Sequence, residues 1–197
     1  MYRIYGALIE MMAAAVFIIP LWCIYNKLWF HSWKRTIIYM VFGLYLTALL
    51  ALVGFPSVMS LKIDFTVNLI PFVDMAADFI NACLNILLFV PFGFFLPILW
   101  EPFRKIKNAA ITGLLTTLFI EVSQIFTYRT TDINDLITNT IGTIIGYFIA
   151  RWITNKFTKR ILTNSKTGDF YLLCGTVGLV MFFLQQFVSV LLWEMVL

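Results

Sequence analysis

Charged residues are scarce in this sequence of 197 residues. Asp, Glu, Lys and Arg together make up 12% of it, whereas soluble domains are about 25% charged. Hydrophobic residues make up 61%, and the mean hydropathy is +0.92. This composition excludes an ordinary soluble protein and indicates an integral membrane protein.

Cysteine and histidine are also rare, with three cysteines and one histidine. Cys23, Cys83 and Cys174 all fall in apolar segments. An odd number of cysteines without Cys-x-x-Cys spacing points to neither a disulfide framework nor a zinc site, so we expect small buried hydrophobic side chains. His31 lies in a basic loop, where we expect it to be solvated or interfacial.

Six apolar runs have roughly the 20 residues that a helix needs to cross a bilayer. They are residues 5–25, 36–55, 79–100, 109–126, 135–153 and 171–193. They take up most of the chain and leave no room for a soluble domain, and the first run lacks the basic start and cleavage site of a signal peptide. We therefore predict an all-α membrane protein, in which residues 1–197 form a single polytopic bundle of about six transmembrane helices.

The basic residues decide the expected orientation. Eleven of the fourteen Lys and Arg lie in the loops after the first, third and fifth runs. Because basic loops are retained in the cytoplasm, we expect these loops inside the cell and both termini outside. Topology and contact with anionic lipids account for this charge, so no nucleic-acid partner is expected.

Polar side chains interrupt the apolar runs at helical spacing. The set comprises Asn85 in the third run, Glu121 and Gln124 on one face of the fourth, and Asn139 on the face of the fifth that carries Gly142 and Gly146. With alternating helix directions, all of these polar residues fall in the outer half of the membrane, as does Glu10 in the first run. Charge at that depth is costly, so this convergence predicts a site.

Two interpretations of this set stay open. In the structural one, side chains pair across helices, each pair contributing about 0.6 kcal/mol. Asp132 and Asp135 then resemble a capping box at the start of the fifth helix. In the functional one, the set lines an outward-facing polar cavity for a headgroup. Glu121 favours the functional interpretation, because the sequence offers it no structural role.

The functional interpretation assigns chemistry to each residue type. Arg129 can bind a phosphate or carboxylate through two hydrogen bonds. The neutral headgroup contacts would come from Asn68, Asn85, Gln124 and Asn139. If the protein is an enzyme, Glu121 serves as general acid or base, with Asp132 and Asp135 as orienting or metal ligands. The three carboxylates could instead hold Mg²⁺, although no spacing in the sequence shows a metal.

One outer segment departs from helical spacing. Residues 61–69 alternate apolar and polar side chains, which predicts an extended stretch. Pro71 would end that stretch or confine it to an edge. It is either a flap or re-entrant segment lying on the bundle, or a simple interfacial loop.

Proline and glycine mark two helices. In the third run, Pro91 removes a backbone hydrogen bond and Gly93 removes side-chain bulk, so we expect a kink near mid-membrane. That kink either serves packing or shapes a cavity. Gly142 and Gly146 in the fifth run form a GxxxG face, which we expect to pack within this protein rather than to form a dimer.

These motifs resemble the VanZ-like family of bacterial membrane proteins. The resemblance rests on an Asn-Leu-Ile-Pro-Phe segment at 68–72, on Asn85 with the Leu-Phe-Val-Pro-Phe-Gly-Phe-Phe-Leu-Pro segment at 88–97, and on the ordered set Glu121, Gln124, Arg129, Asp132, Asp135, Asn139 and Gly142. It covers a core of about residues 68–147. Many relatives have a histidine after the glutamate, whereas this chain has Val122, which argues against a required imidazole.

The resemblance implies a protein of the bacterial cell envelope, because the family's namesake is associated with resistance to glycopeptide antibiotics of the teicoplanin type. We expect a plasma-membrane protein that recognises a lipid-linked or amphiphilic molecule at the outer leaflet and lowers glycopeptide susceptibility. Its partner would be a membrane lipid, a lipid-linked cell-wall precursor or the antibiotic. The alternatives are a hydrolase or transferase that acts on a lipid headgroup through Glu121, a lipid translocator, and a structural scaffold.

Overall fold

The computed structural model describes residues 2–63, 67–68, 70–71, 79–127, 131–157 and 165–196. The chain divides into two compact units. Unit 1 comprises Met1–Lys62 and Phe170–Leu197, and unit 2 comprises Ile63–Asp169. Apart from one pair of two-residue strands, the regular structure of the described residues is helical, which confirms the predicted all-α class.

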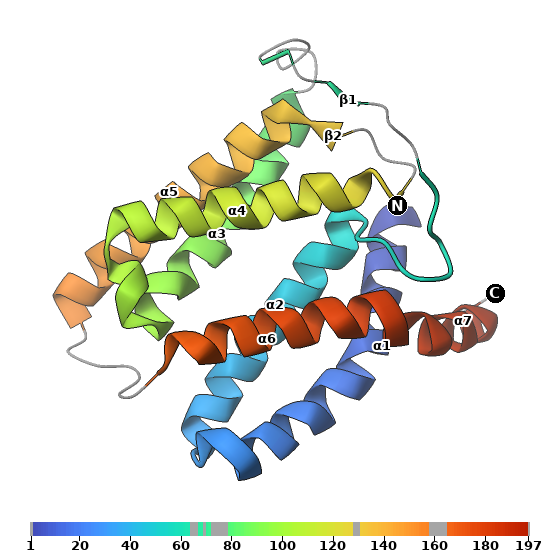
Figure 1. Ribbon diagram of the computed structural model, residues 1–197, viewed down its shortest axis with the longest axis horizontal. Coiled ribbons are helices and arrows are strands. Elements are labelled where there is room, and N and C mark those ends of the chain that lie inside the picture. The colour runs from blue at the N-terminus through green and yellow to red at the C-terminus, as the bar shows by residue number, and fades with distance from the viewer. Residues whose placement is uncertain are drawn as a thin grey trace. The chain divides into compact units, whose positions relative to one another are not determined.

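Unit 1 is built from α1 (Tyr2–Tyr25), the π-helical turn η1 (Asn26–Phe30), α2 (Trp33–Val53), α6 (Thr167–Leu179), the π-helical turn η3 (Val180–Leu184) and α7 (Gln185–Val196) (Figure 1). Asn26 sets the start of α2, because its Oδ1 accepts hydrogen bonds from Ser32 N and Thr36 Oγ1, both at 2.9 Å. Gly54 ends α2 with a φ of 71°, the left-handed conformation common after a helix.

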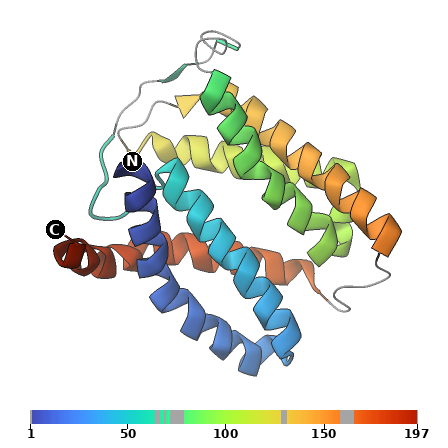
Figure 2. The same ribbon diagram turned by 180° about the vertical axis from the view of Figure 1, so that it is seen from behind.

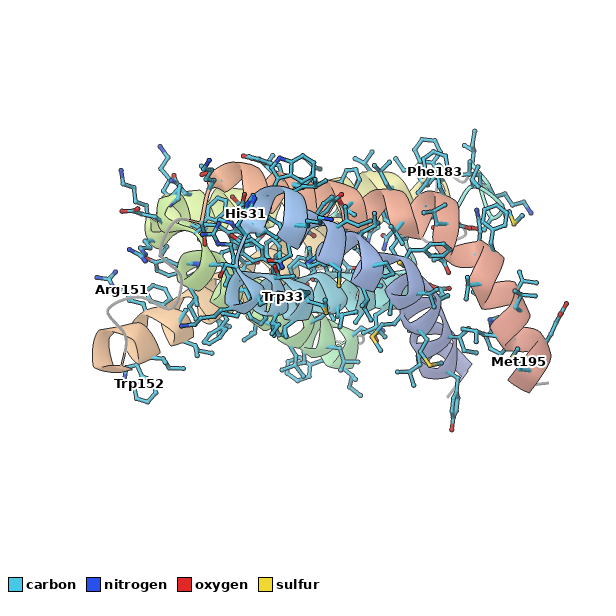
Figure 3. The ribbon with its side chains drawn as sticks, turned by 90° about the horizontal axis from the view of Figure 1, so that it is seen from below. His31, Trp33, Arg151, Trp152, Phe183 and Met195 are labelled. Atoms are coloured by element: carbon cyan, nitrogen blue, oxygen red, sulfur yellow. The ribbon has the colours of Figure 1, made fainter. Side chains whose placement is uncertain are left out.

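Unit 1 has an exposed turn between η1 and α2, and hydrogen bonds connect its helices and loops. His31 and Trp33 are exposed at the turn between η1 and α2 (Figure 3), as expected for His31. Tyr25 Oη and Thr176 Oγ1 share a hydrogen bond of 2.9 Å between α1 and α6. The chain after α2 is tied to η3 and α7, since Val58 N donates to Phe182 O and Met59 N donates to Gln186 Oε1.

Unit 2 contains β1 (Val67–Asn68), α3 (Phe79–Leu99), the 3₁₀ turn η2 (Glu101–Arg104), α4 (Ile106–Gln124), β2 (Thr131–Asp132) and α5 (Ile133–Phe157). Helices α3 and α5 run parallel and pack more extensively than any other pair, while α4 runs back between their ends (Figures 1 and 2). Strand β1 pairs in parallel with β2, Asn68 lying opposite Asp132. The predicted extended backbone is thus confirmed at Val67–Asn68, and residues 64–66 and 69 lie outside the described part.

Glycine allows α3 and α5 to approach closely. A Cβ on Gly142 would overlap the carbonyl of Ile86, one on Gly146 the carbonyl of Val90, and one on Gly93 the backbone of Thr143. We call these three close approaches between α3 and α5 the glycine contact. At such separations, Cα–H groups can donate weak hydrogen bonds to carbonyl oxygens. It confirms that the GxxxG face packs within the protein. Helix α3 is continuous through Pro91 and Pro97, and the kink at Pro91 stays a prediction.

Five helical segments of the described chain are long and apolar enough to cross a membrane. They are Tyr5–Phe30, Trp33–Val53, Phe79–Leu99, Ile133–Ile153 and Thr167–Met195. The protein is therefore a multi-pass membrane protein. The predicted span at 109–126 is not among the five, because α4 also carries Lys107, Asn108 and Glu121.

The path of the chain nevertheless makes α4 a crossing. Because α3 and α5 are parallel neighbours, α4 must carry the chain back from the end of α3 to the start of α5. Its 19 residues span about 28 Å at 1.5 Å each, close to the roughly 30 Å hydrocarbon thickness. The geometry of unit 2 therefore agrees with six crossings.

The expectation that all three cysteines are buried was wrong. Cys23 and Cys83 are exposed on their helices, and Cys174 is half-buried. A thiol on a membrane helix can pack against lipid as well as against protein. An apolar sequence context therefore did not predict burial within the chain.

Candidate functional site

The N-terminal ends of α3 and α5, the C-terminal end of α4 and the β1–β2 pair meet at one end of unit 2, which we call the polar end. Hydrogen bonds join five of the residues singled out in the sequence, in two groups. Asn68 and Glu121 bond to Asp132, and Asn85 bonds to Asp135. The predicted convergence of polar side chains from several helices is thus confirmed for α3, α4 and α5.

Asp132 is the N-cap of α5, as the structural interpretation of the sequence expected. Its Oδ1 accepts from Asn134 N at 2.8 Å, and its Oδ2 accepts from Asn68 Nδ2 at 3.3 Å. A cap of this kind satisfies one of the free N–H groups at a helix start. The bond from Asn68 fixes β1 to the same carboxylate.

The second half of the capping box differs from the prediction. The backbone N–H of Asp132 donates to Glu121 Oε2 at 3.0 Å, so a residue of α4 does what the third helical residue does in an ordinary capping box. Thr131 Oγ1 also donates to the backbone carbonyl of Glu121 at 3.0 Å. The sequence argument that Glu121 has no structural role was therefore wrong: its buried carboxylate holds the start of α5 against the end of α4.

Because Glu121 accepts from the backbone N–H of Asp132, the Asp135 carboxylate bonds to a different helix. Its Oδ1 accepts a short hydrogen bond of 2.6 Å from Asn85 Nδ2 of α3. A hydrogen bond to a charged acceptor is worth about 1.5–3 kcal/mol. This bond lies at the polar end of the same α3–α5 pair that the glycine contact holds together deeper in the membrane.

A second polar layer of the polar end lies one helical turn deeper, at Asn139. Asn139 Nδ2 donates to Thr117 Oγ1 at 2.8 Å, and both residues are buried. Among the residues that the structure describes, Asn139 Oδ1 has no hydrogen-bond partner, although Asn139 is only 3% exposed. Thr117 was missed in the sequence, yet it shares a helix face with Gly113 and Glu121 at spacings of four, which was the signal available.

The other predicted contacts are placed as follows. Gln124 is buried at the last residue of α4. Arg129 lies outside the described residues, so its predicted role as an anion contact stays a prediction. Glu10 lies on α1 in unit 1, half-buried.

The three carboxylates do not form the magnesium group that the sequence allowed. Glu121, Asp132 and Asp135 bind three different protein donors. Within the described ranges, no group of three His, Cys, Asp or Glu side chains is arranged to hold a metal ion.

Basic residues occupy the opposite end of unit 2. Arg104, Lys105 and Lys107 are exposed around η2 and the start of α4, and Arg151 projects with Trp152 from the C-terminal part of α5 (Figure 3). Tyr147 Oη donates to the Arg104 carbonyl at 2.6 Å and fastens α5 to η2. These basic side chains thus lie at the other end of unit 2 from Asp132 and Asp135, with Glu101 of η2 among them.

The sequence model of the VanZ/LLP1 family matches residues 38–154, from α2 to α5 and including every residue of the polar end. The chain belongs to the VanZ/LLP1 family. It is also similar to Protein VanZ of Enterococcus faecium, with 32% identity over 81 residues, which are 41% of this chain and 50% of that protein. The chain thus spans about half the length of this VanZ relative. No solved structure matches it.

Proposed function

We propose that this VanZ/LLP1 protein recognises a lipid-linked or amphiphilic molecule at the outer leaflet of the bacterial plasma membrane and lowers susceptibility to teicoplanin-like glycopeptides. The observation that carries the proposal is the buried polar end of α3, α4 and α5, where acids and amides from three helices meet. Family membership and the similarity to Protein VanZ support the link to drug resistance.

The arrangement suits a headgroup that enters from the membrane surface. Asn85 of α3 donates to Asp135 of α5, and the Glu121 carboxylate of α4 accepts from the backbone N–H of Asp132. These side chains are already held in place and do not have to be ordered when a ligand arrives. Less entropy is then lost on binding. Exposed apolar side chains on α3 and α4, including Leu84, Leu87 and Phe119, offer a surface for an acyl chain beside it.

The orientation is the first testable part of the proposal. In a variant lacking the native cysteines, Ile70→Cys lies near the polar end and Lys107→Cys at the basic end, and both positions are exposed. By the positive-inside rule, an impermeant maleimide should label the first variant in intact cells and the second only after permeabilisation. The reverse pattern would place the polar end in the cytoplasm and overturn the proposal.

The function itself is tested by drug susceptibility. Asp135→Asn removes a charge but keeps an oxygen that can accept from Asn85, so the fold should persist. We expect cells producing wild-type protein to resist teicoplanin better than cells without it, and Asp135→Asn to lose most of that protection at equal protein levels.

The matched control is Asp169→Asn, the same change at an acid whose Oδ2 accepts from Lys166 N, away from the polar end. It should protect as well as wild type does. Equal protection by Asp135→Asn and wild type would show that the polar end is not the site.

A further inference from the structure

The polar end is rich in hydrogen-bond acceptors and in negative charge. A carboxylate oxygen can only accept, and the segment from Glu121 to Asp135 contains three carboxylates and one arginine. The amide of Asn139 adds a neutral acceptor, because its nitrogen is committed to Thr117 while its Oδ1 has no partner in the described part of the chain.

Asn139 lies one helical turn from the nearest acid of the polar end. In an α-helix the Cα–Cβ bonds tilt toward the N-terminus, and the N-terminus of α5 is at the polar end. The side chain of Asn139 therefore leans toward Asp135, which lies one turn earlier on the same face. Both layers belong to unit 2 and join α5 to its two neighbouring helices.

A buried acceptor without a donor is costly, about 1–3 kcal/mol when a partner is missing. A ligand that donates there removes this cost, and a positive charge on it is favoured by the net negative charge of the segment. A primary ammonium has three donors, no acceptor and one positive charge. A hydroxyl lacks the charge, and a quaternary ammonium lacks the donors.

We propose that the polar end binds a primary ammonium group, which donates to Asn139 Oδ1 and lies beside the Asp135 carboxylate. This inference rests on the proposed function, because it assigns a protonated amine to the amphiphile recognised there. The amine can belong to a lipid headgroup or to a soluble molecule, and the two sources present the same chemistry.

The experiment compares two cations on the purified full-length protein in detergent. Methylammonium has donors and tetramethylammonium has none. At equal ionic strength, methylammonium chloride should raise the Tm of wild type by about 2–4 °C, and tetramethylammonium chloride should not. In Asn139→Leu and in Asp135→Asn, this difference between the two cations should disappear. Two variants are used so that the test still stands if one of them fails to fold.

Asn108→Leu is the matched control, since Asn108 lies on α4 at the basic end and donates to Pro102 O. It should keep the wild-type response. Equal shifts from the two cations, or a response unchanged in both polar-end variants, would overturn the proposal.

A second arm identifies the source of the amine. Nanodiscs of phosphatidylethanolamine and phosphatidylcholine with identical acyl chains differ in the same donors. A higher Tm in phosphatidylethanolamine that depends on Asn139 supports a lipid source, while a response to methylammonium alone supports a soluble one. If wild type does not distinguish the two cations but still protects against teicoplanin, only this inference is overturned. If wild type distinguishes them but Asp135→Asn protects fully, the proposed function is overturned instead.

Discussion

Gly146→Leu should abolish the native packing of α3 and α5. A side chain at this position would meet the carbonyl of Val90 and the backbone nitrogen of Phe94. Backbone atoms cannot change rotamer, so the two helices would have to separate. Overpacked cores usually lose about 1–3 kcal/mol, and we expect a larger loss here because separation also opens the contacts at Gly93 and Gly142.

The measurement is the thermal unfolding of purified protein, together with the yield of monodisperse material. Gly175→Leu supplies the matched control, because a Cβ on Gly175 of α6 meets nothing within 4 Å. Leucine is a better helix former than glycine by roughly 0.8 kcal/mol, so this variant should be as stable as wild type or more so. Similar behaviour of the two variants would show that the glycine contact does not hold the helices together.

Two substitutions at Glu121 should separate its structural role from its charge. Glu121→Gln keeps an oxygen that can accept from Asp132 N, whereas Glu121→Leu leaves that N–H without its acceptor. Removing the acceptor from a buried donor costs about 1–3 kcal/mol. We expect a clear fall in Tm for Glu121→Leu and a Tm near wild type for Glu121→Gln.

The effect of Glu121→Gln on drug protection should differ from its effect on stability. Under the proposed recognition of a cationic headgroup, Glu121→Gln folds but loses most of the teicoplanin protection, and mass spectrometry of the envelope lipids finds the same species as with wild type. A lipid or precursor that appears or vanishes only with wild type would instead identify an enzyme with Glu121 as its acid or base. Full protection by Glu121→Gln would leave Glu121 with a purely structural role.

The sequence predicted the polar end because helical spacing and alternating direction are both visible in it. Spacing placed Asn85 and Asn139 on helix faces, and the alternation of basic loops placed both at the same end. The GxxxG spacing of Gly142 and Gly146 likewise predicted close packing. Each of these inferences needed only one helix at a time and a rule for its direction.

The partners could not be read from the sequence in the same way. Glu121 accepts from Asp132 across a turn between two helices. The spacing of polar residues along a helix does not predict the path that such a turn takes. The pairing of β1 with β2 joins residues 64 positions apart, and each strand has only two residues. The sequence counted α4 as a span like the others, but α4 is not among the five described segments apolar enough to cross a membrane. It carries polar residues such as Thr117 and Glu121, which bond to Asn139 and Asp132.

The pairing of α3 with α5 also sets an order of events during biosynthesis. Asn85 and Asp135 are 50 positions apart, and at 5–20 residues per second the ribosome needs about 3–10 s to cover that distance. For that time α3 exists without the helix that covers its glycine and its amide. The insertion machinery or surrounding lipid must shelter α3 until α5 emerges, so the polar end is completed late, when the first half of the chain has already entered the membrane.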